Sequence, residues 1–167
     1  HLFTRDVFCF WEDRGEVRMQ LKPHAPGIRK FSEQALTAKA RTIIKSMRAS
    51  KDSGKAVMFY SCIIGSIPGQ TATAIKVADT FVRSLRERLD QVFIINPAEY
   101  FEPGMDGDDL MFMWEQVQRS GLINIWRFQS MEDIEASFGL MGLKVPPVWS
   151  GKDATFSTGC TKEMRIA

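Results

Sequence analysis

Histidine is nearly absent from this sequence, which contains only His1 and His24. His24 lies between two prolines, in a stretch that is typical of a turn. Ser–His–Asp triads, Cys–His dyads and multi-histidine metal sites all need a positioned imidazole. The sequence therefore argues against these catalytic and metal-binding classes, and we expect neither a bound metal nor a cofactor.

Cysteine is also scarce. Cys9, Cys62 and Cys160 are odd in number and widely separated, and no C-x-x-C pair occurs. This pattern indicates neither a disulfide framework nor a structural zinc site. A reducing compartment is the simplest expectation, so we expect a cytoplasmic protein.

Long apolar runs and strong net charge are missing as well. No run approaches the roughly 18 apolar residues of a membrane span. The net charge is +2, and the chain is 44% hydrophobic and 25% charged. These are ordinary values for a globular protein. At 167 residues the chain has the usual length of one domain, and we predict a single domain over residues 1–167.

The first 50 residues predict a β-hairpin followed by a basic helix. Residues 6–11 and 16–21 are strand-like and are joined by a short turn. Apolar residues then recur at helical spacing from Phe31 to Met47, with Ser32 placed as the N-cap. The outer face of this helix carries four basic residues: Lys39, Arg41, Lys45 and Arg48. No aromatic residues alternate with them, so single-stranded nucleic-acid binding is weakly supported, and a contact with a phosphate backbone or with a protein partner stays open.

Residues 56–140 predict the core of an α/β domain. A continuous apolar run at 56–64 is typical of a strand that is covered on both faces. A helix from Thr71 to Leu89 and a second apolar strand at 92–95 complete a βαβ unit, which should be parallel. A third strand is expected at 122–127. We predict a three-layer α/β domain with a mainly parallel central sheet, followed by an irregular or edge-strand tail over 145–167.

The turn after the first core strand is the strongest candidate for ligand binding. It contains Gly65, Ser66, Gly69, Gln70 and Thr71. In open α/β sheets, ligands bind beyond the carboxyl ends of the strands, where a helix N-terminus attracts anions. The turn matches neither the Walker nor the dinucleotide-binding pattern. A tight turn with a threonine cap is the alternative interpretation of the same residues.

Three carboxylates are candidate catalytic residues. Asp106 and Asp108 lie in an acidic loop, and Glu135 lies in the first turns of a helix that follows the third strand. Neighbouring carboxyl groups can perform acid–base chemistry when burial shifts their pKa values. Solvated helix caps are the alternative, because aspartate is favoured at helix starts for its own reasons.

Two short motifs resemble the nucleoside 2-deoxyribosyltransferase-like family, which includes nucleotide N-glycosidases. They are the run from Met58 to Gly69 and the run Ile95-Asn96-Pro97-Ala98-Glu99. The similar region extends from Val57 to Gly139, about half of the chain.

This resemblance implies roles for the candidate residues. Gly65, Ser66 and Gly69 would approach the sugar or phosphate of a nucleotide. An acid from the Asp106–Asp109 loop would assist departure of the base, and Glu135 would attack or stabilise the anomeric carbon. Such a reaction needs one carboxyl group that protonates and one that stabilises.

We therefore expect a nucleotide- or nucleoside-binding domain, whose enzymatic form would cleave or transfer an N-glycosidic bond. The sequence leaves open a non-catalytic interaction domain of a larger protein or assembly. Three features favour that alternative: the absence of an initiating methionine, a loop at 128–131 that lacks the glycine expected before a catalytic glutamate, and a cluster formed by Met105, Met111, Phe112, Met113 and Trp114. The sequence does not decide whether the domain is an enzyme.

Overall fold

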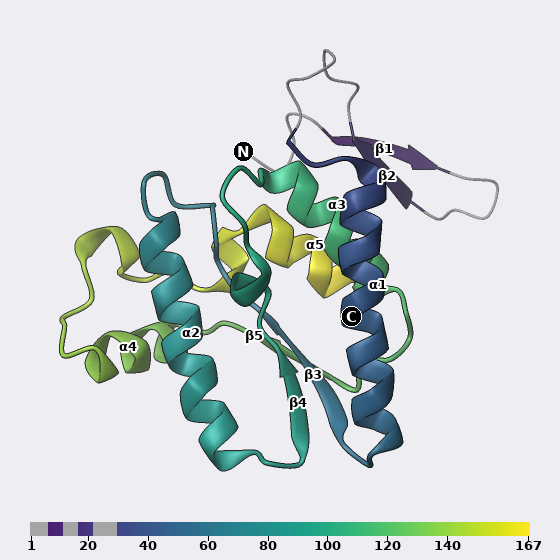
Figure 1. Ribbon diagram of the computed structural model, residues 1–167. Coiled ribbons are helices and arrows are strands. Elements are labelled where there is room, and N and C mark those ends of the chain that lie inside the picture. The colour runs from purple at the N-terminus through teal and green to yellow at the C-terminus, as the bar shows by residue number, and fades with distance from the viewer. Residues whose placement is uncertain (1–6, 12–16, 22–29) are drawn as a thin grey trace.

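The computed structural model describes residues 7–11, 17–21 and 30–167. The first two of these ranges are β1 (Val7–Trp11) and β2 (Val17–Leu21), which pair antiparallel in a sheet of their own (Figure 1). The predicted hairpin is confirmed. The turn between the strands and the stretch around His24 lie outside the described residues.

The central sheet is fully parallel. It contains β3 (Ala56–Ser61), β4 (Val92–Ile95) and β5 (Ile125–Phe128) in the order β4-β3-β5. Central β3 is buried from its second residue onward, as its continuous apolar run predicts. The predicted parallel pairing of the first two core strands is confirmed, and so is the α/β fold class.

β5 begins later than the sequence suggests. Before β5, the side-chain Oδ1 atom of Asn124 accepts a hydrogen bond from the backbone amide of Val57 at 3.0 Å. The backbone amide of Asn124 donates to the Val57 carbonyl at 2.9 Å. The Lys51 ammonium donates to the same Oδ1 at 3.0 Å. The Asn124 side chain thus replaces a backbone acceptor at the start of the β3–β5 pairing, and regular pairing begins only at Ile125.

Helices cover both faces of the sheet (Figure 1). α1 (Glu33–Asp52) and α3 (Gly107–Gln118) pack together on one face, and α2 (Thr71–Arg88) and α4 (Met131–Leu140) pack together on the other. A short 3-10 helix, η1 (Pro97–Tyr100), follows β4. No helix in the described ranges is long and apolar enough to cross a membrane.

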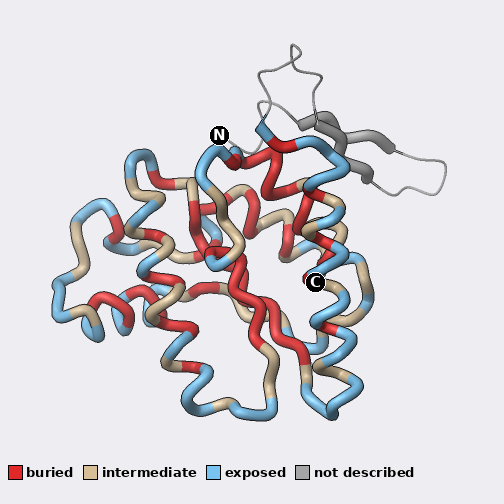
Figure 2. Tube along the Cα trace, viewed as in Figure 1, coloured by how far each residue is buried: buried red, intermediate tan, exposed pale blue. Residues whose placement is uncertain are grey.

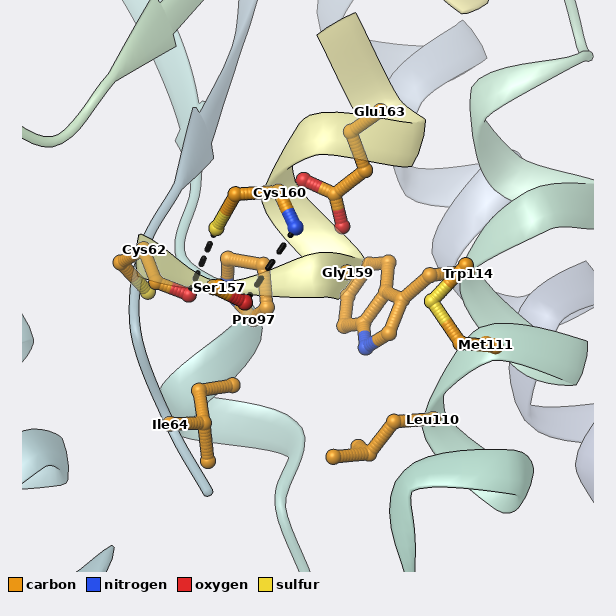
Figure 3. Close-up of a pocket in the computed structure, with 10 residues that line it drawn as sticks. All are labelled: Cys62, Ile64, Pro97, Leu110, Met111, Trp114, Ser157, Gly159, Cys160 and Glu163. Carbon is orange, nitrogen blue, oxygen red and sulfur yellow. Dashed lines mark hydrogen bonds between the residues drawn. The ribbon is translucent and has the colours of Figure 1, made fainter. Parts of the chain in front are cut away.

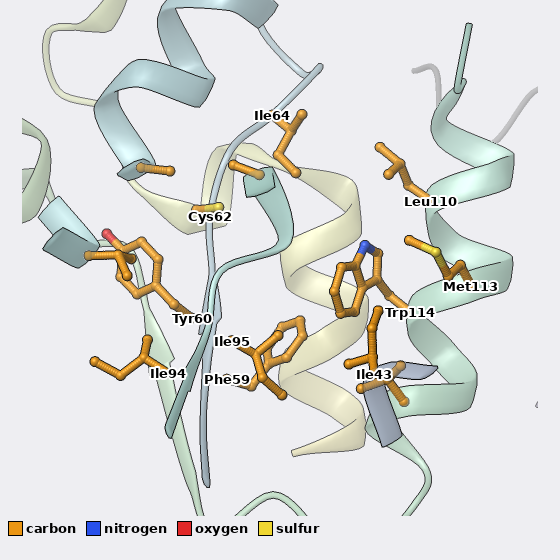
Figure 4. Packing of buried hydrophobic residues seen from close by; sticks show 14 of the residues in the cluster. Ile43, Phe59, Tyr60, Cys62, Ile64, Ile94, Ile95, Leu110, Met113 and Trp114 are labelled. Carbon is orange, nitrogen blue, oxygen red and sulfur yellow. The ribbon is translucent and has the colours of Figure 1, made fainter. Parts of the chain in front are cut away.

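The main core fills the space between the sheet and these helices (Figures 2 and 4). At its centre, the rings of Phe59 and Trp114 meet edge to face with centroids 5.6 Å apart. A smaller cluster joins Ile67, after β3, to Phe138 on α4 and to Trp149 in the tail. This cluster fixes the turn after β3 against the end of the chain.

The tail over 145–167 is helical, so the expected edge strands are wrong. It contains η2 (Pro147–Trp149), η3 (Ala154–Phe156) and α5 (Thr158–Ile166). The Ser157 hydroxyl caps α5 by accepting a hydrogen bond from the Cys160 amide at 3.3 Å. Few apolar residues mark this helix in the sequence, because its buried face consists of Gly159, Cys160 and Glu163.

Candidate functional site

A pocket lies at the carboxyl edge of the parallel sheet, between the ends of β3 and β4 and the helices α3 and α5 (Figure 3). Its enclosed space is small, about 20 Å³, and the rest of the hollow is open to solvent. Ile64 and Pro97 contribute apolar walls from the segments after β3 and β4, and Leu110 contributes one from α3. This is the edge at which open α/β sheets collect ligands.

Trp114 of α3 forms another wall of the pocket. It shares a helix face with Leu110, four residues earlier. The indole is held by edge contacts with Phe59 and Tyr100, whose ring centroids lie 5.6 and 5.4 Å away. Only 3% of Trp114 is exposed, and its Nε1 atom has no hydrogen-bond partner among the described residues. In Figure 3 this nitrogen points toward the space between Ile64 and Leu110.

Glu163 of α5 supplies the carboxyl group of the pocket. The residue is 8% exposed, and its Oε2 atom has no partner in the described part of the chain. Burial raises the pKa of Glu163 to about 7, although the polar side chains of Ser61 and Gln118 partly offset this effect. No lysine or arginine in the described ranges lines the pocket. The carboxyl group is therefore poised between its neutral and charged forms near neutral pH.

Two thiols lie beside this carboxyl group. The Cys160 thiol donates to the Cys62 carbonyl at 3.3 Å (Figure 3). Burial raises the pKa of Cys160 to about 12 and the pKa of Cys62 well above its ordinary value. Both thiols therefore stay protonated at neutral pH, which makes them poor nucleophiles.

The predicted ligand turn runs from this edge toward α2. Gly65 and Ser66 are half-buried, and Gly69 is exposed with a φ of +71°, which favours glycine. Gln70 is the N-cap of α2 but makes no side-chain cap, since its Oε1 atom accepts a hydrogen bond from the Trp149 indole at 3.1 Å. Thr71 is the first helical residue.

The pocket lining stops at Ile64, so residues 65–71 do not form its walls. Gln70 acts there as a structural link between the turn and the tail. The carboxyl edge was predicted as the site, but the residues that line the pocket are different ones.

Asp106 and Asp108 occupy the first turn of α3. Asp106 is its N-cap: its Oδ1 atom accepts from the Asp109 amide at 2.9 Å, and Asp109 Oδ2 accepts from the Asp106 amide at 3.1 Å. Asp108 is buried, with 1% exposure. The helix-capping alternative therefore describes Asp106.

The structure does not bring Glu135 together with Asp106 or Asp108, which corrects the expected convergence of these residues. Glu135 is exposed on α4, which packs against α2, whereas the two aspartates lie on α3 across the sheet (Figure 1). The reason is that α3 and α4 follow strands on either side of β3 and cover opposite faces. Glu135 instead lines a separate pocket with Trp149 and Lys152, whose enclosed space is about 50 Å³.

Trp114 and Glu163 were not singled out from the sequence. In the sequence, Trp114 is one member of an apolar cluster. The helix that carries Glu163 has no regular apolar spacing that would predict it. The one feature of the sequence that could have predicted this helix is Ser157, a favoured N-cap residue directly before it.

No protein-family model, curated protein or solved structure matches the chain. The resemblance to the nucleoside 2-deoxyribosyltransferase-like family therefore stays a prediction, and a functional proposal rests on the residues of the pocket.

Proposed function

We propose that this domain binds a nucleoside or nucleotide at the carboxyl edge of the sheet, with one edge of the base entering the pocket between α3 and α5. The observation that carries the proposal is a pair of buried polar atoms in a mainly apolar pocket, Trp114 Nε1 and Glu163 Oε2, for which the described residues supply no hydrogen-bond partner. Buried polar groups are almost always hydrogen-bonded, so such a pair suits a ligand that supplies the missing partners.

A nucleobase suits the chemistry of this pocket. It is planar and apolar on its faces, which suits walls formed by Ile64, Pro97 and Leu110. Its edge carries donors and acceptors of the kind that the indole N–H and the carboxyl group need. The enclosed space of about 20 Å³ is smaller than a whole base, so one edge of the base would enter it while the rest of the ring lies on the open side.

The enzymatic form of the proposal assigns the acid role to Glu163. A pKa of about 7 suits a group that gives a proton to a departing base. Glycosidic cleavage normally uses two carboxyl groups within about 5–10 Å of each other. Among the described residues, Glu163 is the one acidic residue in the pocket lining, which favours binding over two-carboxylate cleavage.

The test is titration calorimetry with a panel of nucleosides and nucleotides, together with chromatography for released base. We expect at least one member of the panel to bind, and Trp114→Phe to weaken that binding several-fold because the N–H is lost. Trp126→Phe, a change on β5 outside the pocket lining, is the matched control. The proposal fails if no member binds, or if both substitutions have the same effect.

The interaction domain is a second candidate, favoured by exposed apolar side chains on and after α4. Leu140 and Leu143 are 63% and 59% exposed, and Val148 and Met131 are 40% and 39% exposed. Neighbouring exposed apolar residues often mark protein contacts. Sedimentation velocity over a concentration series tests self-association: a dimer that dissociates in Leu140→Ser/Leu143→Ser supports this candidate, and a monomer throughout argues against a contact between copies.

A further inference from the structure

α4 presents an exposed outer face at one edge of the molecule, beyond α2 (Figure 1). Its inner face is fixed to the fold: the Ser137 hydroxyl donates to the Val77 carbonyl at 2.8 Å, and the rings of Phe138 and Trp149 meet edge to face with centroids 5.9 Å apart. The outer face consists of Glu132, Glu135, Ala136, Gly139 and Leu140, which are all exposed (Figure 2). These residues recur every three or four positions, so they form one stripe along the helix.

The segment after α4 extends this stripe by a fixed leucine. The Gly142 amide donates to the Gly139 carbonyl at 3.0 Å, and the Leu143 amide donates to the Phe138 carbonyl at 2.9 Å. Gly142 has a φ of +73°, so these bonds form a Schellman cap. The apolar residue after such a cap commonly packs back onto its helix, yet Leu143 is 59% exposed and Leu140 is 63% exposed. Two neighbouring leucines are thus held in solvent by a defined backbone, which is typical of a contact surface.

Charges of opposite sign lie at the two ends of the stripe. Glu132 and Glu135 lie in the first half of α4, and Lys144 directly follows Leu143. All three are exposed, and none of them forms an ion pair with another residue of the described ranges. Between the two ends, Ala136 and Gly139 have the smallest side chains of the stripe, so a second helix can approach closely there.

We infer that α4 pairs antiparallel with α4 of a second copy of this chain, around a two-fold axis between Ala136 and Gly139. This pairing brings Lys144 of each copy beside the acidic end of the other copy, where Glu132 lies. A parallel pairing would instead place acid beside acid and lysine beside lysine. A two-fold interface requires a patch that complements itself, and a stripe with opposite charges at its ends meets this requirement.

The same pairing covers the exposed apolar side chains. Leu140 and Leu143 of one copy come to the end of the other helix at which Met131 is 39% exposed. The leucines therefore supply affinity, whereas the charges set the orientation, because exposed ion pairs contribute little energy each. A ten-residue helix offers a small interface, so we expect a weak dimer whose population depends on concentration.

This inference goes beyond nucleoside binding. It rests on the second candidate function, a contact through the exposed residues on and after α4, and it names the partner and the geometry of that contact. Sedimentation velocity of the full chain over a concentration series, at low and high salt, gives the dimer dissociation constant for each variant. Circular dichroism checks that each variant is folded.

Charge reversal tests the antiparallel arrangement. Lys144→Glu alone, or Glu132→Lys/Glu135→Lys alone, should weaken the dimer several-fold, because each places like charges at both ends of the interface. An equimolar mixture of these two variants should associate more tightly than either one alone, since the mixed dimer restores attraction at both ends. The triple variant Glu132→Lys/Glu135→Lys/Lys144→Glu should dimerise like the wild type, and high salt should weaken the wild-type dimer.

Leucine substitution tests the location of the contact. Leu140→Ser/Leu143→Ser should raise the dissociation constant at least about tenfold, because the apolar contact is lost. Phe156→Ser is the matched control: Phe156 is an exposed apolar residue, at 48%, on η3 and outside the stripe. It should leave the dimer unchanged.

The failures are distinguishable. A wild type that stays monomeric at every concentration overturns both the inference and the contact between copies. A dimer that dissociates in Leu140→Ser/Leu143→Ser but is unaffected by charge reversal, or a mixture that associates no better than its components, overturns the antiparallel pairing and leaves the second candidate function standing. A dimer that is equally sensitive to Phe156→Ser overturns the assignment to α4. None of these results bears on nucleoside binding, which the titration of the pocket decides separately.

Discussion

Glu163 shows how far a fold can change the chemistry of one residue. Its carboxyl group is buried, and no lysine or arginine of the described segments lines its pocket, so burial raises its pKa from 4.5 to about 7. Burying a carboxyl group in this way costs stability whenever the group is charged. The protein tolerates that cost at the edge of the sheet where a ligand would bind, which is a common feature of functional sites.

The same shift predicts a pH dependence of stability. Below pH 4.5 the carboxyl is protonated in the folded and unfolded states, and above about pH 7 it is ionised in both, with the folded state penalised. Stability from this group is therefore present at acid pH and lost as the pH rises through 7. Relative to Glu163→Gln, the wild type should lose about 2 to 3 kcal/mol of unfolding free energy between pH 5 and 8. Urea unfolding at both pH values measures this difference.

Glu135→Gln is the control for that experiment, because Glu135 is exposed and lies on α4. It should follow the wild type at both pH values. Parallel pH curves for the wild type and Glu163→Gln would show that the carboxyl group is not buried as described.

At the scale of elements, α5 is the part of the fold that completes the pocket. It carries Cys160 and Glu163 to the ends of the strands, and Ser157 caps its first turn. Ser157→Ala should lower the unfolding free energy by about 1 kcal/mol, the usual value of an N-cap. Ser150→Ala, an exposed serine in the same tail, should change it by less than about 0.5 kcal/mol. Equal effects of the two substitutions in urea titrations would contradict the capping role.

α4 is anchored to the sheet through Asp133. Its carboxylate accepts hydrogen bonds from the Tyr60 hydroxyl at 3.2 Å, from Arg127 at 2.8 Å and from the Ser130 amide at 3.3 Å. Asp133 is 3% exposed and Tyr60 is fully buried, so loss of the carboxylate leaves the buried Tyr60 hydroxyl without this acceptor. Asp133→Ala should destabilise the protein by about 2 to 4 kcal/mol, and exposed Glu132→Ala by less than about 0.5 kcal/mol. A small effect of Asp133→Ala on thermal unfolding would contradict the anchoring role.

Elements with a strong apolar signal were predictable from the sequence, and elements without one were not. β3 and β4 are continuous apolar runs, and α1 has regular apolar spacing with Ser32 as its N-cap, which accepts from the Ala35 amide at 3.1 Å. α5 was missed because its buried face is polar or small. β5 starts late because the Asn124 side chain replaces backbone pairing, and composition gives no indication of such a contact.

At the scale of the whole molecule, the topology decides which residues can form a site. The carboxyl edge was predictable, because parallel strands deliver their ends to one side of the sheet. The separation of Glu135 from Asp106 and Asp108 could not be predicted, because packing, and not order along the chain, decides which face of the sheet each helix covers. Trp114 and Glu163 come together only through the contact between α3 and α5.

The basic face of α1 is a separate feature of the whole molecule. Lys39 pairs with Glu102, but Arg41, Lys45 and Arg48 are exposed on the surface. If an acidic partner binds there, Arg41→Glu/Lys45→Glu should weaken association and flatten its salt dependence. Binding that is unchanged over a salt series would leave these residues as a solvated helix face.

The most direct test of the central claim is the indole N–H resonance of Trp114, recorded by ¹⁵N-correlated NMR during titration with adenosine. Trp114→Phe assigns the signal. We predict a progressive downfield shift as the unpartnered N–H gains an acceptor, while the Trp149 signal, already bonded to Gln70, stays in place. A Trp114 signal that does not move at saturating adenosine, or a shift confined to Trp149, would contradict the account of this pocket as the ligand site.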